Sequence, residues 1–175
     1  MTAAKTEGIS CVVAQVPFVD GLATAFRLDF VQRMKSIGHG LLDLARVLSF
    51  RKPHCVPFVA GPEEFALMNT PDSKTGYMAL IPKDSLWENK TPARILLGIP
   101  LYRPVRFADK IKCPVLLIYA GRDALIPPDT VEKTITRIKN VKAVRLDVGH
   151  FEVYAGEHFD RIAEMEGDFI KKCLA

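Results

Sequence analysis

The stretch PVLLIYAGRD, residues 114–123, decides the fold of this chain. A proline leads into the unbroken apolar run Val115–Ala120, and a glycine turns the chain out of it, which is typical of a strand buried on both faces. Such strands belong to parallel sheets that helices cover on each side. The carboxylate that follows the run is Asp123, and it leaves the strand at the end where open α/β sheets gather their reactive groups.

The residues after this strand predict a second unit of the same kind. The two prolines at 127 and 128 preset the first turn of a helix that we expect to extend to about residue 138. A strand is predicted over 142–148, and His150 follows it closely. A last helix is predicted over 159–173, with an apolar face made of Ile162, Met165, Phe169 and Ile170. Strand, helix, strand and helix in this order indicate a right-handed parallel unit.

The first half of the chain is less regular. Residues 9–16 are apolar almost throughout and predict another strand covered on both faces. Two helices are then expected, over 22–34 and 41–50, with Gly38-His39-Gly40 separating them and a broad apolar face on the second. Residues 20–108 are predicted to form an irregular, mainly helical insertion. After the two helices, it is expected to contain short helices near Glu63–Met68, Ser85 and Ala93.

Asp123 and His150 gain their meaning as a pair. Alone, Asp123 fits an aspartate that caps a turn, and His150 fits a hydrogen-bonded structural histidine. Both, however, follow strands, and the single helix between them allows those strands to be neighbours. The carboxylate then reaches the imidazole, fixes its tautomer and stabilises the imidazolium formed in catalysis. The pair therefore favours the acid and base of a nucleophilic mechanism.

In these residues the chain resembles the α/β-hydrolase family. The resemblance rests on Ile111-Lys112-Cys113-Pro114 with the strand after it, on Gly121-Arg122-Asp123, on Ile126-Pro127, and on Gly149-His150-Phe151 with Tyr154. The family places its triad acid after the seventh strand and its histidine after the eighth, positions that match Asp123 and His150. Within residues 9–21, the run CVVAQVPFVDG is similar to the family's sixth strand.

The resemblance implies an α/β fold, namely a truncated α/β-hydrolase fold with about three parallel strands, flanking helices and a mainly helical cap. Residues 1–19 and 109–175 are expected to form the C-terminal part of the hydrolase core. Residues 20–108 are expected to form the cap-like insertion. The implied activity is hydrolysis of ester or amide bonds in small molecules by a Ser-His-Asp triad.

The family's nucleophile is where this sequence departs from the pattern. It lies on a G-x-S-x-G elbow after the fifth strand, beside the donors of the oxyanion hole. The serines here lack the flanking glycines; they are Ser10, Ser36, Ser49, Ser73 and Ser85. We therefore expect the C-terminal part of a hydrolase, inactive alone, from a truncated product, a split gene or a shortened version. A non-catalytic hydrolase-like interaction module is the alternative.

Charge and hydropathy limit the kinds of binding partner that we expect for this chain. The net charge of +4 comes from scattered basic residues without a phosphate-binding stripe, so nucleic acid is not expected. No signal peptide and no apolar run of membrane-spanning length is seen, which favours a cytoplasmic protein without membrane attachment. If the family's strand order holds, residues 9–16 form a sheet edge without its neighbour, and that edge favours self-association.

Other sites are weaker candidates, and neither a metal nor a cofactor is expected. The four cysteines contain no C-x-x-C pair. A metal site built from His150 and His158, with Glu152 or Glu157, matches no usual zinc spacing. Cys55 lies in a proline-rich stretch without a strand-turn-helix elbow, which disfavours a nucleophilic role.

Overall fold

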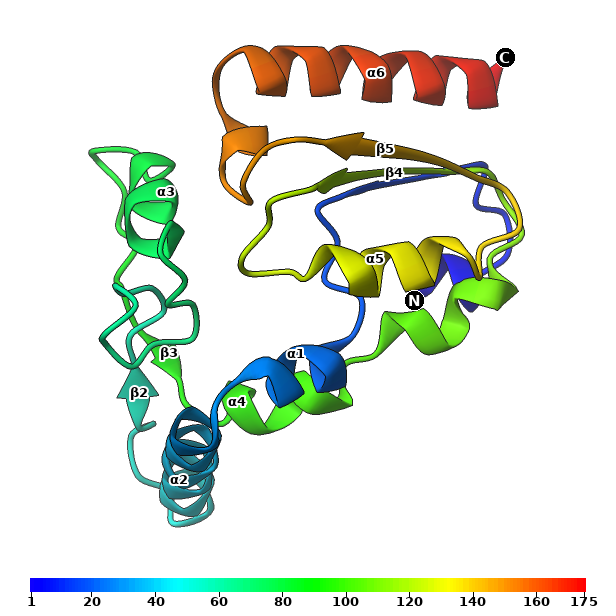
Figure 1. The fold of residues 1–175 in the computed structure, drawn as a ribbon. Helices are drawn as coiled ribbons and strands as arrows, with labels where there is room; N and C mark the ends of the chain where they lie inside the picture. Colours follow the sequence, from blue (N-terminus) through cyan, green and yellow to red (C-terminus); the bar gives the residue numbers. More distant parts are fainter. The chain divides into compact units, whose positions relative to one another are not determined.

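The computed structural model describes residues 1–175, and they divide into two compact units. The first unit contains Met1–Val19 and Arg103–Ala175, and the second contains Asp20–Tyr102. The expected boundary at 108/109 differs from this division by six residues, 103–108, which lie in the first unit. Figure 1 follows the chain through both units.

The first unit is built on a parallel sheet of three strands in the order β1-β4-β5. The strands are β1 (Val12–Gln15), β4 (Val115–Ala120) and β5 (Val141–Leu146). All six residues of the central strand β4 are buried, as its apolar run predicts, and β1 and β5 form the two edges. The α/β class and the parallel strands expected from the sequence are confirmed. β1 is shorter than expected, while β5 begins and ends slightly earlier.

Helices cover both faces of this sheet. On one face lie α5 (Pro128–Ile135) and the 3-10 helix η3 (Pro104–Lys110), and on the other lies α6 (Gly156–Leu174). Alternate residues of β4 serve the two layers, as the period of a strand requires. The layer on the α5 side is formed by Val19, Ala108, Val115, Leu117, Tyr119, Ile126, Val131 and Ile138. The layer on the α6 side is formed by Val16, Leu116, Ile118, Ala120, Leu146, Val148, Val153 and Ile162.

The helix α6 carries the predicted apolar face with one exception. Ile162 is almost fully buried, and Met165 and Phe169 pack against the same layer. Ile170 was expected on this face, but it is 40% exposed. The reason is rotation, since one residue advances the helix by about 100°, which turns Ile170 away from the direction of Phe169.

The second unit corrects the predicted helix boundaries. The helix α1 (Gly21–Arg27) ends before Leu28, whose backbone is extended, and Asp29 caps the next helix by accepting the N–H of Gln32 at 2.8 Å. That helix, α2 (Phe30–Leu48), passes without a break through Gly38-His39-Gly40, so the expected interruption there is wrong. The chain breaks instead where an aspartate N-cap begins a new helix.

Gly40 has a packing role that a single sequence does not reveal. It is buried against the helix α4 (Ile95–Gly98), and a Cβ at this position would lie 2.6 Å from Cγ of Leu97. Gly40 therefore allows the two helices to approach closely. The packing against α4 compensates for the low helix propensity of glycine.

The rest of the second unit has little regular structure. It contains the short antiparallel pair β2 (Cys55–Val56) and β3 (Thr91–Pro92), and the helix α3 (Ser73–Ala79), which was not predicted. The helix expected near Glu63–Met68 is absent, and Met68 bridges to Val59 instead. No helix forms near Ser85, whereas α4 begins two residues after Ala93. The remaining short elements are the 3-10 helices η1 (Thr2–Ala4), η2 (Ile99–Leu101) and η4 (Glu152–Tyr154).

A buried carboxylate organises this second unit. Asp43 of α2 is fully buried and accepts the backbone N–H of His54 at 2.7 Å and of Arg94 at 3.0 Å. The guanidinium of Arg94 lies 3.7 Å away. Burial opposes the charge of Asp43, but the two N–H donors and the nearby cations outweigh it and lower the pKa of this carboxyl. Asp43 thus joins α2 to residues on each side of the β2-β3 pair.

The apolar face of α2 is turned outward. Residues spaced three and four apart along it are exposed, from 40% for Leu44 to 72% for Leu48, and they include Phe30, Met34, Ile37 and Leu41. The predicted apolar face is therefore present, yet it does not form a core, because the polar and small residues of α2 face the rest of the unit. None of the helices has both the length and the apolar character that crossing a bilayer requires.

Candidate functional site

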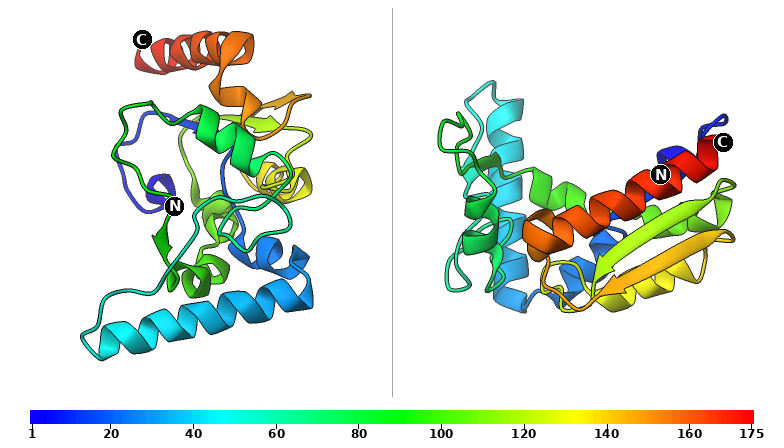
Figure 2. Two further views of the ribbon diagram at one scale, coloured as in Figure 1. Left: turned by 90° about the vertical axis from the view of Figure 1, so that its left-hand side faces the viewer. Right: turned by 90° about the horizontal axis from the view of Figure 1, so that it is seen from above.

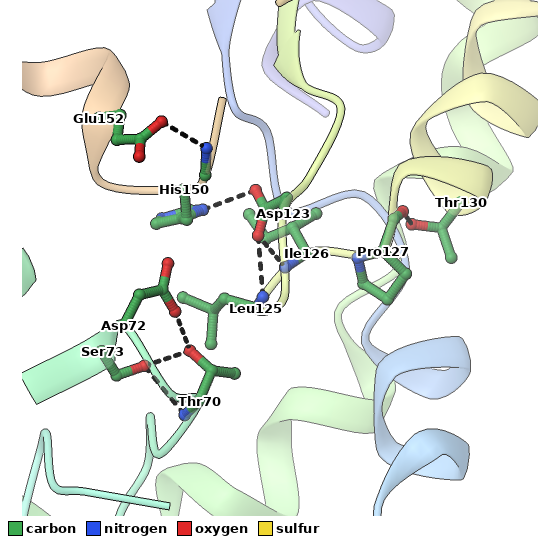
Figure 3. A network of polar contacts seen from close by, with 11 residues as sticks. Thr70, Asp72, Ser73, Asp123, Leu125, Ile126, Pro127, Thr130, His150 and Glu152 are labelled. Atoms are coloured by element: carbon green, nitrogen blue, oxygen red, sulfur yellow. Dashed lines mark hydrogen bonds and ion pairs between the residues drawn. The ribbon is translucent and has the colours of Figure 1, made fainter. Parts of the chain in front are cut away.

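The first residue of the site is Asp123, which lies in the turn after β4. One carboxylate oxygen, Oδ1, accepts the backbone N–H of Leu125 at 2.8 Å and of Ile126 at 2.7 Å (Figure 3). These bonds fold the turn around the carboxylate and fix its rotamer. Only 2% of the side chain is exposed. The other oxygen, Oδ2, is left to point away from this turn.

The second residue is His150, and it meets that free oxygen. Its Nδ1 lies 2.8 Å from Oδ2 of Asp123 (Figure 3), and its side chain is 10% exposed. The two residues follow β4 and β5, which are hydrogen-bonded neighbours in the sheet. The contact expected from the two strand ends is therefore present.

Backbone bonds hold the two loops together where they leave the sheet. The N–H of Gly121 donates to the carbonyl of Leu146 at 2.6 Å, and the N–H of Arg122 donates to the carbonyl of Val148 at 3.0 Å. A side chain at 121 would crowd the neighbouring strand, because a Cβ there would lie 3.0 Å from the backbone carbonyl oxygen of Leu146. The two strands thus stay paired up to the residues that carry the carboxylate and the imidazole.

Arg122 and Glu152 brace the same loops from outside, a role that the sequence did not reveal. The guanidinium of Arg122 donates to the carbonyl of Asp147 at 2.8 Å and lies 3.8 Å from the carboxylate of Glu152. Glu152 also accepts the N–H of Gly149 at 2.9 Å. The only signal for this brace was the position of these residues beside Asp123 and His150.

The loop that carries His150 is also anchored from below. Val153 is fully buried in the layer between the sheet and α6, and its carbonyl accepts a hydrogen bond from Nε2 of Gln15 at 3.3 Å. Gln15 is the last residue of β1, so all three strands of the sheet hold this loop. The loop that carries the imidazole is therefore held in place, and so is the carboxylate that the imidazole contacts.

Two aromatic rings lie beside the imidazole. Phe151 and Tyr154 approach it edge-on, with ring centroids 4.8 and 6.0 Å from that of His150. Burial, and then the charge of Asp123, raise the pKa of the Tyr154 phenol. The tyrosine is thus held in its neutral form, which adds no second negative charge beside the carboxylate.

This geometry determines which ring nitrogen of His150 is available. An ionised carboxylate only accepts hydrogen bonds, so Nδ1 must carry the proton that it donates to Asp123. In the neutral ring Nε2 is then unprotonated and can take a proton from a nucleophile or a water molecule. The arrangement suits general base catalysis in which the carboxylate orients the ring.

The other candidate residues do not join this pair. His158 and Glu157 are exposed in the first turn of α6, and Glu152 is engaged in the brace. No group of three or more metal-ligating side chains is arranged to hold an ion. Cys55 is exposed in the second unit.

The serines are occupied elsewhere. Ser10 is the one serine of the first unit, and it precedes β1, at the opposite ends of the strands from His150, roughly 20 Å along a strand. In the second unit each serine hydroxyl makes a local bond: Ser36 to Gln32, Ser49 to Ala45, Ser73 to Thr70 (Figure 3), and Ser85 to Trp87.

Comparisons with known proteins agree with the fold. No protein-family model matches the chain. The quorum-quenching protein AidA of Acinetobacter baumannii (strain MDR-ZJ06) is 34% identical over 173 residues, which are 99% of this chain and 57% of that protein. The chain thus spans well under two thirds of this curated relative, and 59% of two uncharacterised 31.7 kDa Escherichia coli proteins.

Solved structures give the same result. The α/β-hydrolase GrgF from Penicillium sp. sh18 superimposes with a TM-score of 0.70 at 16% identity, over 97% of this chain and 57% of that one. The structure of DcsB in complex with its substrate analogue gives a TM-score of 0.76 at 17% identity, over 97% and 58%. At these identities the likeness concerns the fold, and it confirms the fold that the sequence motifs implied.

Proposed function

We propose that this chain, which has the α/β-hydrolase fold, supplies the base and the acid of a serine-hydrolase triad. His150 is the general base, and Asp123 orients it. The observation that carries the proposal is the 2.8 Å bond from Nδ1 to Oδ2, made while the other carboxylate oxygen is held by two backbone N–H groups. The reaction is hydrolysis of an ester or amide bond in a small molecule.

In this mechanism Nε2 of His150 removes the proton of the nucleophile as its oxygen attacks the carbonyl carbon. The same nitrogen then protonates the leaving group, and in the second half of the cycle it activates water. The carboxylate of Asp123 stabilises the imidazolium in both halves without taking its proton. The fixed turn and the braced loops keep the ring in place, which lowers the cost of reaching the transition state.

The nucleophile and the oxyanion donors belong, in this proposal, to residues outside these 175. Two observations support this. The serines of the second unit make local hydrogen bonds, and Ser10 lies at the wrong ends of the strands. The curated relatives that match nearly all of this chain are also much longer than it is. The isolated chain is therefore expected to be inactive.

For the substrate, the proposal follows the relative AidA. AidA is described as a quorum-quenching protein, so a small signalling molecule with an ester, lactone or amide bond is the class to test first. In the proposal the second unit acts as the cap that selects this molecule, and no cofactor takes part in the reaction.

A fluorophosphonate probe tests the proposal, because it forms a covalent bond only with an activated serine. We expect no labelling of the 175-residue chain and strong labelling of a protein that also includes the polypeptide encoded directly upstream. An in-frame G-x-S-x-G sequence in that upstream DNA would identify the serine. In the longer protein His150→Ala should abolish labelling, whereas His158→Ala, which changes an exposed histidine, should preserve it.

Two results would contradict the proposal. Labelling of the 175-residue chain at one of its own serines would place the nucleophile inside it. Turnover of p-nitrophenyl esters by His150→Ala in the longer protein, at the wild-type rate, would remove His150 from the mechanism.

The second candidate is a non-catalytic interaction module, and the position of β1 favours it. This strand is an edge of the sheet, and its bonds to β4 start at Val12 and end at Val16, so the alternate residues Val13 and Gln15 direct their backbone groups to the open side. Self-association of the chain through this edge is the expected consequence. Light scattering on a size-exclusion column should show oligomers that increase with concentration; a sharp monomer peak would oppose it.

A further inference from the structure

Cys11 lies on the face of the sheet that α6 covers. Two residues later in the same strand, Val13 packs into the layer beneath α6, whereas Val12 and Ala14 pack into the opposite layer. Side chains alternate along a strand, so Cys11 points to the same side as Val13. Its position just before β1 places it at the amino ends of the strands.

Cys173 reaches the same place from the other end of the chain. Ile162, Met165 and Phe169 form the stripe of α6 that packs on the sheet, and Cys173 is one turn beyond Phe169 on the same side of the helix. Figures 1 and 2 show that the C-terminal end of α6 lies near the beginnings of the strands. The two thiols therefore face each other across the edge of one core layer.

The electrostatics of Cys173 agree with this placement. Burial raises the pKa of its thiol, and the hydrogen bond and charge of Cys11, followed by the charge of Cys113, raise it further. Both residues are partly exposed, so small molecules can reach them. Each is a free thiol in this structure.

The other two cysteines serve as comparisons. Cys113 precedes β4 by two residues, and it lies near enough to Cys173 for its charge to contribute to the raised pKa of that thiol. Cys55 is exposed in the second unit. The thiol of Cys173 is hydrogen-bonded to Cys11, which makes Cys11 the favoured partner and Cys113 the nearest competitor.

We infer that Cys11 and Cys173 are a redox modification site that forms a reversible disulfide within the chain when a low-molecular-weight disulfide acts as oxidant. The thiolate of Cys11 attacks one sulfur of the oxidant, forms a mixed disulfide and releases one thiolate of the oxidant. The thiol of Cys173 loses its proton to solvent, and the resulting thiolate attacks the Cys11 sulfur. This step releases the remaining half of the oxidant as its second thiol. Two protein thiols are oxidised, and one disulfide is reduced to two thiols.

The bond joins the start of β1 to the last turn of α6. These segments are the two ends of the first unit, and the second unit is inserted between them in the sequence. A bond between them restricts the unfolded chain more than it alters the folded one, because the two side chains already converge. Oxidation should therefore raise the midpoint of thermal unfolding of the chain, and a reductant should reverse the increase.

The test uses the native chain, incubated with oxidised glutathione, blocked with N-ethylmaleimide and digested with trypsin without reduction. Trypsin separates the cysteines, because lysine or arginine residues lie between them. Mass spectrometry should find the Cys11 peptide joined to the C-terminal Cys173 peptide, and the number of titratable thiols should fall from four to two. Cys11→Ser should abolish the joined peptide and leave glutathione on Cys173. Cys55→Ser and Cys113→Ser should retain it.

Three results would overturn the inference. One is that all four thiols of the folded chain remain titratable, or carry glutathione, without any crosslink. Another is that the crosslink joins Cys113, or joins two chains, in place of Cys11 with Cys173. The third is that the Cys11–Cys173 crosslink forms only in denaturant, since that would show that the fold does not bring the thiols together.

Discussion

Each unit contains one buried aspartate that accepts two backbone hydrogen bonds, and the two differ in what else they hold. Asp43 in the second unit is fully buried, and the side chains of Arg94 and His54 act on its charge. Asp123 in the first unit uses one oxygen for its two N–H donors and directs the other to His150. One carboxylate holds two backbone N–H groups beside an arginine, while the other accepts a hydrogen bond from a ring that can gain and lose a proton.

The comparison separates a structural carboxylate from one suited to catalysis. Burial and hydrogen bonding alone do not distinguish them, because both residues have these. The partner and the place in the fold do: Asp43 lies in the middle of a helix against backbone, whereas Asp123 lies at the end of a parallel strand beside an imidazole. Variants at the two positions should therefore fail in different assays.

The largest expected effect is that of Asp123→Asn on catalysis in the longer protein. Because the N–H groups of Leu125 and Ile126 must still be accepted, the amide oxygen takes the place of Oδ1 and the amide NH₂ faces His150. The ring then has to accept at Nδ1, so Nε2 carries the proton and cannot act as base. We expect kcat to fall about 10⁴-fold, as for the same kind of change in other triads.

Steady-state kinetics with p-nitrophenyl esters measure this effect, and a thermal melt checks that the fold persists. Asp147→Asn is the matched control, because Asp147 is an exposed carboxylate of the adjoining loop that pairs with Arg122. It should change kcat by less than about threefold, as for an exposed ion pair. Equal losses for the two variants would show that Asp123 has no special role.

Asp43→Ala should instead destabilise the second unit. It leaves two buried N–H groups without an acceptor, and we expect a loss of about 3 kcal/mol in the free energy of unfolding. Trp87 is the only tryptophan and lies in this unit, so its fluorescence in urea reports the change directly. Asp84→Ala, at an exposed aspartate of the same unit, should stay within about 0.5 kcal/mol of the wild type. A small effect at Asp43 would mean that water replaces the carboxylate.

The charge of Asp43 also predicts how stability depends on pH. Its pKa in the folded chain is lowered below the ordinary value of 3.8, so its contribution is complete above that pH and is lost as the pH falls through the lower, folded value. The difference in unfolding free energy between the wild type and Asp43→Asn should therefore be constant above pH 3.8 and shrink below it. A difference that grows on acidification would reverse the sign.

Alanine substitutions at the two glycines of α2 should have smaller effects on the free energy of unfolding, and these effects should be opposite in sign. Gly40→Ala forces a Cβ to within 2.6 Å of Leu97 and should cost about 1–3 kcal/mol, whereas Gly38 has no neighbour within 4 Å. Gly38→Ala should therefore stabilise the helix by about 0.5–1 kcal/mol. Urea unfolding monitored by Trp87 compares the two variants. Stabilisation by both would show that α2 and α4 do not pack as described.

The smallest effect is expected at the end of α2. Phe50 is fully exposed and has φ of 55°, and the N–H groups of Phe50 and Arg51 bond back to Val47 and Arg46. This is the helix-ending motif in which glycine is preferred, so Phe50→Gly should stabilise by about 0.5–1 kcal/mol. Phe50→Ala keeps the unfavourable backbone and should give no comparable gain in the same unfolding measurement.

The parts of the fold that the sequence predicted are those whose signal is local. An unbroken apolar run is enough to identify β4, and the position of a residue just after such a run is enough to select Asp123. The pairing of β4 with β5 followed from the single helix between them. These features depend on neighbours in the sequence, so they survive without knowledge of the rest of the chain.

The parts that were missed depend on distant partners. Gly40 looked like a helix breaker because Leu97, its contact, is far along the chain. The segment 63–68 looked helical, but the N–H groups of Leu67 and Met68 bond to the carbonyls of Pro57 and Phe58, about ten residues earlier in the chain. Local patterns contain no information on such contacts. For the same reason, the Asp43 network could not be expected from its place in the middle of a helix.

The tautomer of His150 is the most direct test of the pairing on which the proposed function rests. Long-range ¹H–¹⁵N spectra of the ring nitrogens distinguish a neutral ring protonated on Nδ1 from one protonated on Nε2, and they need only the 175-residue chain. We predict that His150 carries its proton on Nδ1 in the wild type and on Nε2 in Asp123→Asn. A wild-type ring protonated on Nε2, or the same tautomer in both proteins, would contradict the assignment of Asp123 and His150 as acid and base.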